Sequence, residues 1–103
     1  MLANFHPDAQ AELNHAIDYY EANQPNLGYQ FAIEVFAAVE RIKAYPTLWP
    51  LMDDSQVRRC LIHRFPYGVI YALNEEEAEI FILAVMHLHR EPGYWSERVS
   101  RLP

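Results

Sequence analysis

The sequence has little of several residue types, and each scarcity narrows the range of proteins it can encode. Its one cysteine, Cys60, cannot form an internal disulfide, and its strand-like flanks favour an ordinary buried thiol. The longest apolar run, residues 80–86, is far shorter than the roughly 20 residues that a helix needs to cross a bilayer. Residues 1–5 carry no basic cluster and no apolar stretch of signal-peptide length. We therefore expect a cytoplasmic protein without a membrane partner.

Basic residues are also few, and lysine is almost absent. Lys43 is the only lysine, and the formal net charge of the chain is −6. The whole imbalance lies in residues 1–54, because acidic and basic residues balance in the other half of the chain. Contacts with phosphates supply most non-specific affinity for nucleic acids, so such an acidic chain is a poor general nucleic-acid binder. We expect no direct sequence-specific DNA binding.

The apolar residues that are present predict a helical hairpin near the start of a single domain spanning residues 1–103. Helical spacing of apolar residues runs over 7–23, and Pro7 suits the first turn of such a helix. Breaker residues follow, and a second helical periodicity continues up to Pro46. Ile33 and Phe36 widen the apolar surface of this second helix, so we expect it to pack on both the first helix and a sheet.

Three runs with strand character follow the hairpin. They cover residues 57–62, 67–73 and 79–88. Short connections favour antiparallel neighbours, and the near-continuous apolar run in the last strand predicts that both of its faces are covered. Residues 92–103 form a C-terminal tail, since Pro92 and Gly93 break the strand. The predicted fold class is α+β, a helical hairpin packed on a curved antiparallel sheet of three to four strands.

Basic residues on the first of these strands form one candidate binding group. Arg58 and Arg59 are adjacent, so they point to opposite faces and cannot both join one site. His63 and Arg64 follow at the turn before the next strand. A binding role competes here with a simpler interpretation, a charged strand that discourages pairing at the sheet edge.

Histidines at the end of the last strand form a second candidate group. Strand alternation would place His87 and His89 on the same face, beside Arg90. Zn²⁺ sites usually need three or four protein ligands, and the sequence supplies no clear third one, so we expect no metal and no cofactor. Histidine and arginine could instead supply a general acid and a phosphate clamp for RNA cleavage.

The tail provides a third group, which combines aromatic and cationic side chains: Tyr94, Trp95, Arg98 and Arg101. Such combinations are enriched at protein-binding hot spots and in base stacking. Equally, Tyr94 and Trp95 could fold back onto the core, and the two interpretations do not exclude each other.

Several motifs taken together resemble ParE-type toxins of the RelE/ParE superfamily. The resemblance rests on the order of two helices and three strands and on three stretches: residues 5–13, the run Arg64-Phe65-Pro66-Tyr67 with residues 69–71, and residues 82–87 with Arg90, Pro92, Tyr94 and Trp95. It spans nearly the whole chain. It implies a short N-terminal edge strand over residues 2–5. It also implies a bacterial type II toxin–antitoxin (plasmid stabilisation) system, in which the C-terminal segment of a cognate antitoxin wraps the toxin and the two proteins form a hetero-oligomer.

The two branches of this superfamily imply different targets. ParE-like members poison DNA gyrase through protein contacts, whereas RelE-like members cut messenger RNA in the ribosome. The acidity of the chain favours the gyrase branch. In this interpretation the protein has no catalytic residue, and its target-binding residues are Arg64, Arg90, Tyr94 and Trp95. The alternative is a ribosome-dependent endoribonuclease that uses His87, His89, Arg64, Arg90 and Tyr94.

Gly68 departs from the pattern of the family. Many members carry a further arginine after the Pro-Tyr pair, where this chain has Gly68. This departure leaves room for a third hypothesis, an inactive orphan interaction module whose only partner is its antitoxin.

Overall fold

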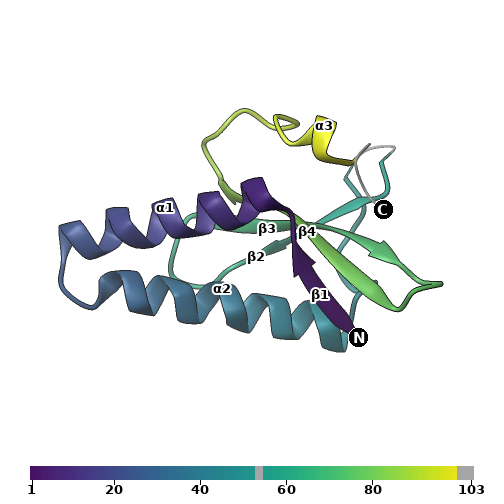
Figure 1. Ribbon diagram of the computed structural model, residues 1–103, viewed down its shortest axis with the longest axis horizontal. Coiled ribbons are helices and arrows are strands. Elements are labelled where there is room, and N and C mark those ends of the chain that lie inside the picture. Colours follow the sequence, from purple (N-terminus) through teal and green to yellow (C-terminus); the bar gives the residue numbers. More distant parts are fainter. Residues whose placement is uncertain (53–54, 100–103) are drawn as a thin grey trace.

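The computed structural model describes residues 1–52 and 55–99, which form seven elements (Figure 1). In chain order they are β1 (Leu2–Phe5), α1 (Pro7–Asn23), α2 (Leu27–Ala44), β2 (Val57–Leu61), β3 (Tyr67–Asn74), β4 (Glu79–His87) and α3 (Ser96–Val99). No helix within the described ranges combines the length and apolar character needed to cross a membrane.

The helical hairpin depends on a close contact between its two helices. A Cβ atom built at Gly28, in the first turn of α2, would lie 2.5 Å from the backbone oxygen of Ile17 in α1. The Glu21 carboxylate caps α2, because it accepts the N–H groups of Asn26 at 2.9 Å and Gly28 at 3.1 Å. The glycine lets the helices approach, and the carboxylate satisfies donors that the approach would otherwise bury.

The four strands form one sheet in the order β1-β4-β3-β2. β2, β3 and β4 pair antiparallel, as their short connections predict, but β1 pairs parallel to β4. The prediction of a purely antiparallel sheet is therefore wrong at this one edge. No tight turn joins β1 to β4, because the whole helical hairpin and two strands separate them in the sequence, so nothing local imposes an antiparallel direction.

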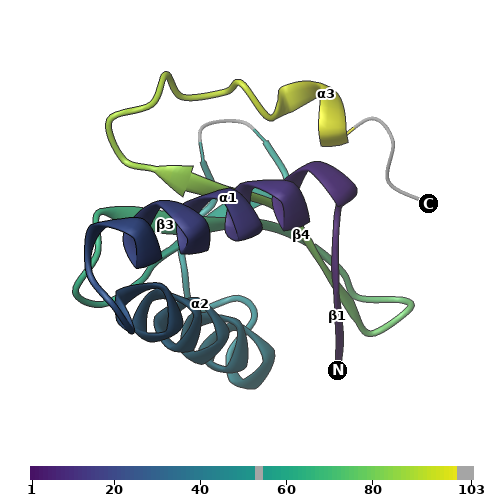
Figure 2. The same ribbon diagram turned by 60° about the vertical axis from the view of Figure 1, so that its left-hand side comes forward.

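Apolar residues cover both faces of the sheet. The helical hairpin packs on one face, where Phe31 and Tyr67 bring their ring centroids to 4.8 Å. The other face is covered by the segment that ends in α3, which lies on the side of the sheet away from α2 (Figures 1 and 2). Trp95 in this segment is 6% exposed and packs with residues of β2, β3 and β4. The expectation that both faces of β4 are covered is confirmed.

A bulge in β4 matches the strand to these two faces. Ile70 pairs with Ala84 and Tyr71 with Ile82, so Leu83 is an extra residue without a partner on β3. Leu83 and Ala84 both belong to the apolar cluster under Trp95. The extra residue therefore increases the apolar contact with the tail.

The structure confirms two further predictions and corrects two others. Cys60 is fully buried, and burial raises the pKa of its thiol. α2 packs on both α1 and the sheet, as expected, but Ile33 and Phe36 are not buried in these contacts and are 47% and 49% exposed. β4 ends at His87, so His89 lies in the turn that follows and not on the strand.

Replacing Gly28→Ala tests the contact between the helices. Alanine normally stabilises a helix relative to glycine by up to about 1 kcal/mol. Here we expect the opposite sign, a loss of about 1–3 kcal/mol in the free energy of unfolding, because the added methyl meets backbone. Urea denaturation of the variant measures the effect. Ala22→Gly, at an exposed position of α1, is the control for helix propensity. An unchanged or higher stability for Gly28→Ala would contradict the close approach.

Candidate functional site

The exposed backbone of β4 beyond the end of β1 organises the candidate site. β1 reaches only as far as Ile82, so beyond that point β4 pairs with β3 on one side and, within the described residues, has no strand on the side where β1 has ended. Side chains take the place of that strand: the Glu12 carboxylate of α1 accepts the N–H of Val85 at 3.0 Å, and Arg98 of α3 donates to the carbonyl of Leu83 at 2.8 Å. α1 and the tail are thus attached to the same strand edge.

Glu12 also holds two arginines. Arg98 donates to both of its carboxylate oxygens at 3.1 Å, and Arg90 approaches one of them at 3.3 Å. Glu12 and Arg98 have 15% and 14% of their side chains exposed, whereas Arg90 is 52% exposed. Burial alone would lower the pKa of Arg98, but the hydrogen bond and charge of Glu12 outweigh it and raise the pKa. The pair formed with Arg98 is structural, and Arg90 retains an exposed side.

Tyr94 lies between the two arginines. The guanidinium carbon of Arg90 is 3.5 Å from the centre of its ring, and that of Arg98 is 5.1 Å away. Burial, together with the negative charge of Glu12, raises the pKa of the Tyr94 hydroxyl. Trp95, its neighbour, is buried against the sheet and has little surface to offer a partner in this conformation. Both aromatic residues were expected to bind a target. Tyr94 lies beside the half-exposed Arg90, whereas Trp95 packs between the tail and the sheet.

His87 and His89 come together, although not through strand alternation. Their ring centroids are 5.1 Å apart, and the backbone N–H of His89 donates to Nδ1 of His87 at 3.1 Å. A cleft of about 410 Å³ between α1 and β4 is lined by His15, Tyr67 and Arg90 as well as His87. In residues 1–52 and 55–99, no three histidine, cysteine or acidic side chains gather closely enough to hold a metal.

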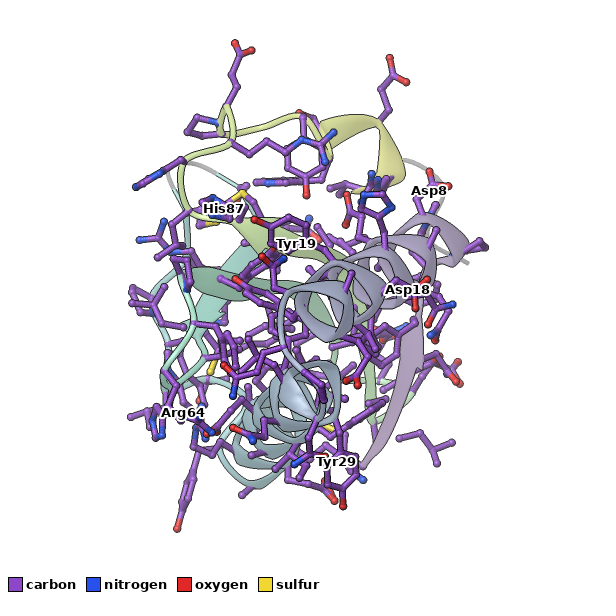
Figure 3. The ribbon with its side chains drawn as sticks, turned by 90° about the vertical axis from the view of Figure 1, so that its left-hand side faces the viewer. Asp8, Asp18, Tyr19, Tyr29, Arg64 and His87 are labelled. Carbon is purple, nitrogen blue, oxygen red and sulfur yellow. The ribbon has the colours of Figure 1, made fainter. Side chains whose placement is uncertain are left out.

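Arg64 lies apart from this group. Figure 3 shows it toward α2, well separated from His87 on the tail side. Arg64 adopts a positive φ of 72°, and its side chain donates to the amide oxygen of Gln30 at 2.7 Å. The sequence-predicted residues therefore divide into a tail group with Arg90 and Tyr94, a histidine pair, and a separate Arg64.

An exposed apolar row on α2 forms a further candidate surface. Tyr29, Ile33 and Phe36 follow one another at helical spacing and are 64%, 47% and 49% exposed. We name these three residues the α2 stripe. The Phe36 ring lies 6.2 Å from that of Phe5 on β1, so the stripe continues to the edge strand of the sheet.

Sequence reasoning missed two residues at the centre of this arrangement, Glu12 and His15. Neither was predicted as a site residue. Their contacts join positions about 70 to 86 residues apart, such as Glu12 with Arg98. No local spacing signals contacts of this range.

Comparison with solved structures shows which fold this is. The chain is similar to a protein of the chromosomal ParDE toxin–antitoxin system from P. aeruginosa, with a TM-score of 0.62, 19% identity, and 86% of this chain and 97% of that chain covered. It is also similar to the isolated E. coli RelE toxin, with a TM-score of 0.60, 17% identity, and 97% and 96% covered. The fold is that of the RelE/ParE toxin superfamily.

A family sequence model identifies the family. The family described as the ParE toxin of the type II toxin–antitoxin system parDE matches residues 3–92. The chain therefore belongs to the ParE toxin family, the toxin component of such a system. No curated protein matches the sequence.

Replacing Glu12→Gln tests whether the carboxylate holds the tail. The amide keeps the shape of the side chain but loses the charge that Arg90 and Arg98 share, so we expect the free energy of unfolding to fall by about 2 kcal/mol. Hydrogen exchange should become faster in α3 before the rest of the chain. In the control Glu40→Gln, only the exposed pair with Lys43 is lost. Equal effects of the two substitutions would contradict the bridging role of Glu12.

Proposed function

We propose that the protein inhibits DNA gyrase by protein–protein binding and is neutralised by a cognate antitoxin. The observation that carries the gyrase proposal is the stacking of half-exposed Arg90 on Tyr94, 3.5 Å from the ring centre, with the Glu12 carboxylate 3.3 Å from the same arginine. Arginine and tyrosine are enriched at the centres of protein interfaces. An arginine already paired with a carboxylate is a poor phosphate clamp, which favours a protein target over RNA.

The other two predicted target-binding residues, Trp95 and Arg64, have secondary roles in this proposal. Trp95 packs beneath the tail and so fixes the position of Tyr94. Arg64 is exposed at a separate point and serves as a second charged contact. The net charge of −6 opposes the approach of a polyanion such as ribosomal RNA.

The antitoxin, in this proposal, docks across the helical hairpin and the sheet edge. The α2 stripe offers three half-exposed apolar side chains in a row, a pattern that suits the apolar face of a partner segment. β1 is an edge strand beside it, with one side unpaired by any strand in the described ranges. Helix face and strand edge together provide both apolar and backbone contacts.

A ribosome-dependent endoribonuclease is the second candidate function, and one observation favours it. His15, His87, Tyr67 and Arg90 line a single cleft, so an imidazole and a guanidinium lie close enough to share a substrate. Imidazole titrates near neutral pH and can act as a general acid.

Inducible expression in a bacterium separates these functions. We expect growth arrest with cleaved or relaxed plasmid DNA and an intact reporter messenger RNA.

Substitutions in the tail group separate the candidate functions further. Tyr94→Ala or Arg90→Ala should weaken gyrase binding about tenfold, equivalent to about 1.4 kcal/mol, whereas Glu91→Ala at the neighbouring exposed position should leave the affinity unchanged. Codon-positioned RNA cuts that are lost in His87→Ala would support the nuclease instead. Undisturbed growth with the folded wild-type protein would support the inactive interaction module.

A double substitution tests the antitoxin surface. Ile33→Glu with Phe36→Glu places two charges on the α2 stripe, where both side chains are about half exposed, so the fold should persist. We expect the double variant to keep its toxicity but to escape neutralisation by the co-expressed cognate antitoxin. Tyr45→Glu, which alters a more exposed aromatic side chain just beyond α2, serves as the control. Neutralisation of the double variant as complete as that of the wild type would reject this docking surface.

A further inference from the structure

The cations of the described residues divide into paired and unpaired sets. Arg90 and Arg98 lie near Glu12, and Lys43 lies 3.2 Å from Glu40. By contrast, in the parts of the chain that the structure describes, Arg41 and Arg59 have no carboxylate oxygen within 4.0 Å. Among the described residues, Arg58 and Arg64 are not ion-paired either, but Arg58 donates to the carbonyls of Thr47 and Trp49, and Arg64 donates to the amide oxygen of Gln30. Two arginines without a carboxylate at one place attract a negative partner, even in a chain of net charge −6.

Arg41 and Arg59 line one groove along the outer edge of β2. The groove has a volume of about 760 Å³, and His63 adds a third basic side chain to it. Its opposite wall is the loop before β2, which is held alongside the strand by an antiparallel bridge between Leu51 and Arg58. The groove is thus built by two backbone segments that are fixed relative to each other.

Apolar side chains supply the rest of the groove lining. Leu51 and Leu61 are 50% and 48% exposed, and Trp49 lies with them. Half-exposed leucines in the lining of one groove gain free energy when a partner covers them, about 25 cal/mol for each Å² of apolar surface removed from water. The lining therefore offers two kinds of contact, cationic and apolar.

Local contacts hold the two arginines at the groove. Arg41 donates to the carbonyl of Leu61 at 3.3 Å, which uses one of the five N–H donors of its guanidinium. The stem of Arg59 lies over Gly68 on β3, where a Cβ atom would come within 3.1 Å of its Cγ. The absence of a side chain at Gly68 gives Arg59 this position, so the family-unlike glycine has a structural consequence at the groove.

We propose that this groove binds an extended, acidic segment of a partner protein, in which carboxylates alternate with apolar side chains. The carboxylates would meet Arg41 and Arg59, and the apolar side chains would cover Leu51 and Leu61. Alternation suits an extended chain, because its successive side chains point to opposite sides. The site is distinct from the tail and from the α2 stripe, so it does not depend on either of the functions proposed for them.

Nucleic acid shares the negative charge of such a segment but fits the groove less well. A long polyanion would meet the field of the whole acidic chain, whereas a short peptide meets mainly the local cations. Half-exposed leucines match aliphatic side chains better than they match phosphates or sugars.

Binding of a synthetic peptide to the purified full chain tests the inference. The probe is a fluorescein-labelled, end-capped peptide of about eight alternating glutamate and leucine residues, long enough to span the groove when extended. We expect saturable binding that weakens as salt is raised, and at least about tenfold weaker binding of the matched glutamine–leucine peptide. Equal binding of the two peptides, or none of either, would overturn the proposal.

Variants of the groove complete the test. Arg59→Gln should weaken binding of the glutamate peptide about tenfold, and Leu61→Asp should abolish most of it by placing a carboxylate among the arginines. Both positions are exposed, so circular dichroism should show an unchanged fold. Lys43→Gln, which removes one positive charge outside the groove, should have no effect. Full binding by both groove variants, or tighter Arg59-dependent binding of a single-stranded RNA oligonucleotide, would reject a peptide site. Since neither gyrase nor antitoxin is present, such a failure leaves the proposed function untouched.

Discussion

The arrangement of the molecule depends on one carboxylate. Glu12 accepts the free N–H of Val85 where β1 has ended, and its oxygens also hold Arg98 and Arg90. Charge-assisted hydrogen bonds between side chains that are mostly buried are stronger than those at an open surface. Because Arg98 belongs to α3, this contact fixes the tail over the second face of the sheet, where Trp95 covers an apolar cluster that would otherwise face water.

The same contact divides the charges of the protein between two roles. Near the tail, acidic and basic side chains neutralise one another and build structure. At the β2 edge, Arg41 of α2 and Arg58 and Arg59 of β2 contact backbone carbonyls or glycine, and no carboxylate of the described residues neutralises their charge. Net charge alone would describe the chain as a uniformly acidic protein, but these three arginines lie together at one edge of the sheet. Different partners can thus be accepted at different places on one small domain.

The sequence predicted those parts of the fold that local patterns determine. Helical periodicity placed α1, short connections predicted antiparallel β2, β3 and β4, and the apolar run in β4 indicated a strand covered on both faces. The parallel pairing of β1 and the end of β4 at His87 depend on distant parts of the chain, and local patterns do not contain them.

The candidate site was less predictable than the fold for the same physical reason. Arg90, Tyr94 and the two histidines could be proposed from their residue types and neighbours. Glu12, which determines what Arg90 can do, acts across about 78 positions. The exposure of Ile33 and Phe36 likewise depends on which surfaces the sheet leaves uncovered, and apolar periodicity cannot distinguish a buried row from an exposed one.

The parallel pairing of β1 with β4 has a consequence for biosynthesis. Residues 2–5 leave the ribosome before their partners at residues 79–82 have been made. Contacts between such distant segments slow folding, because a long loop must close before they form. During translation, the growing chain therefore holds residues 2–5 without their partner strand until β4 has been made. A partner that recognises this strand could meet the toxin before it is fully folded.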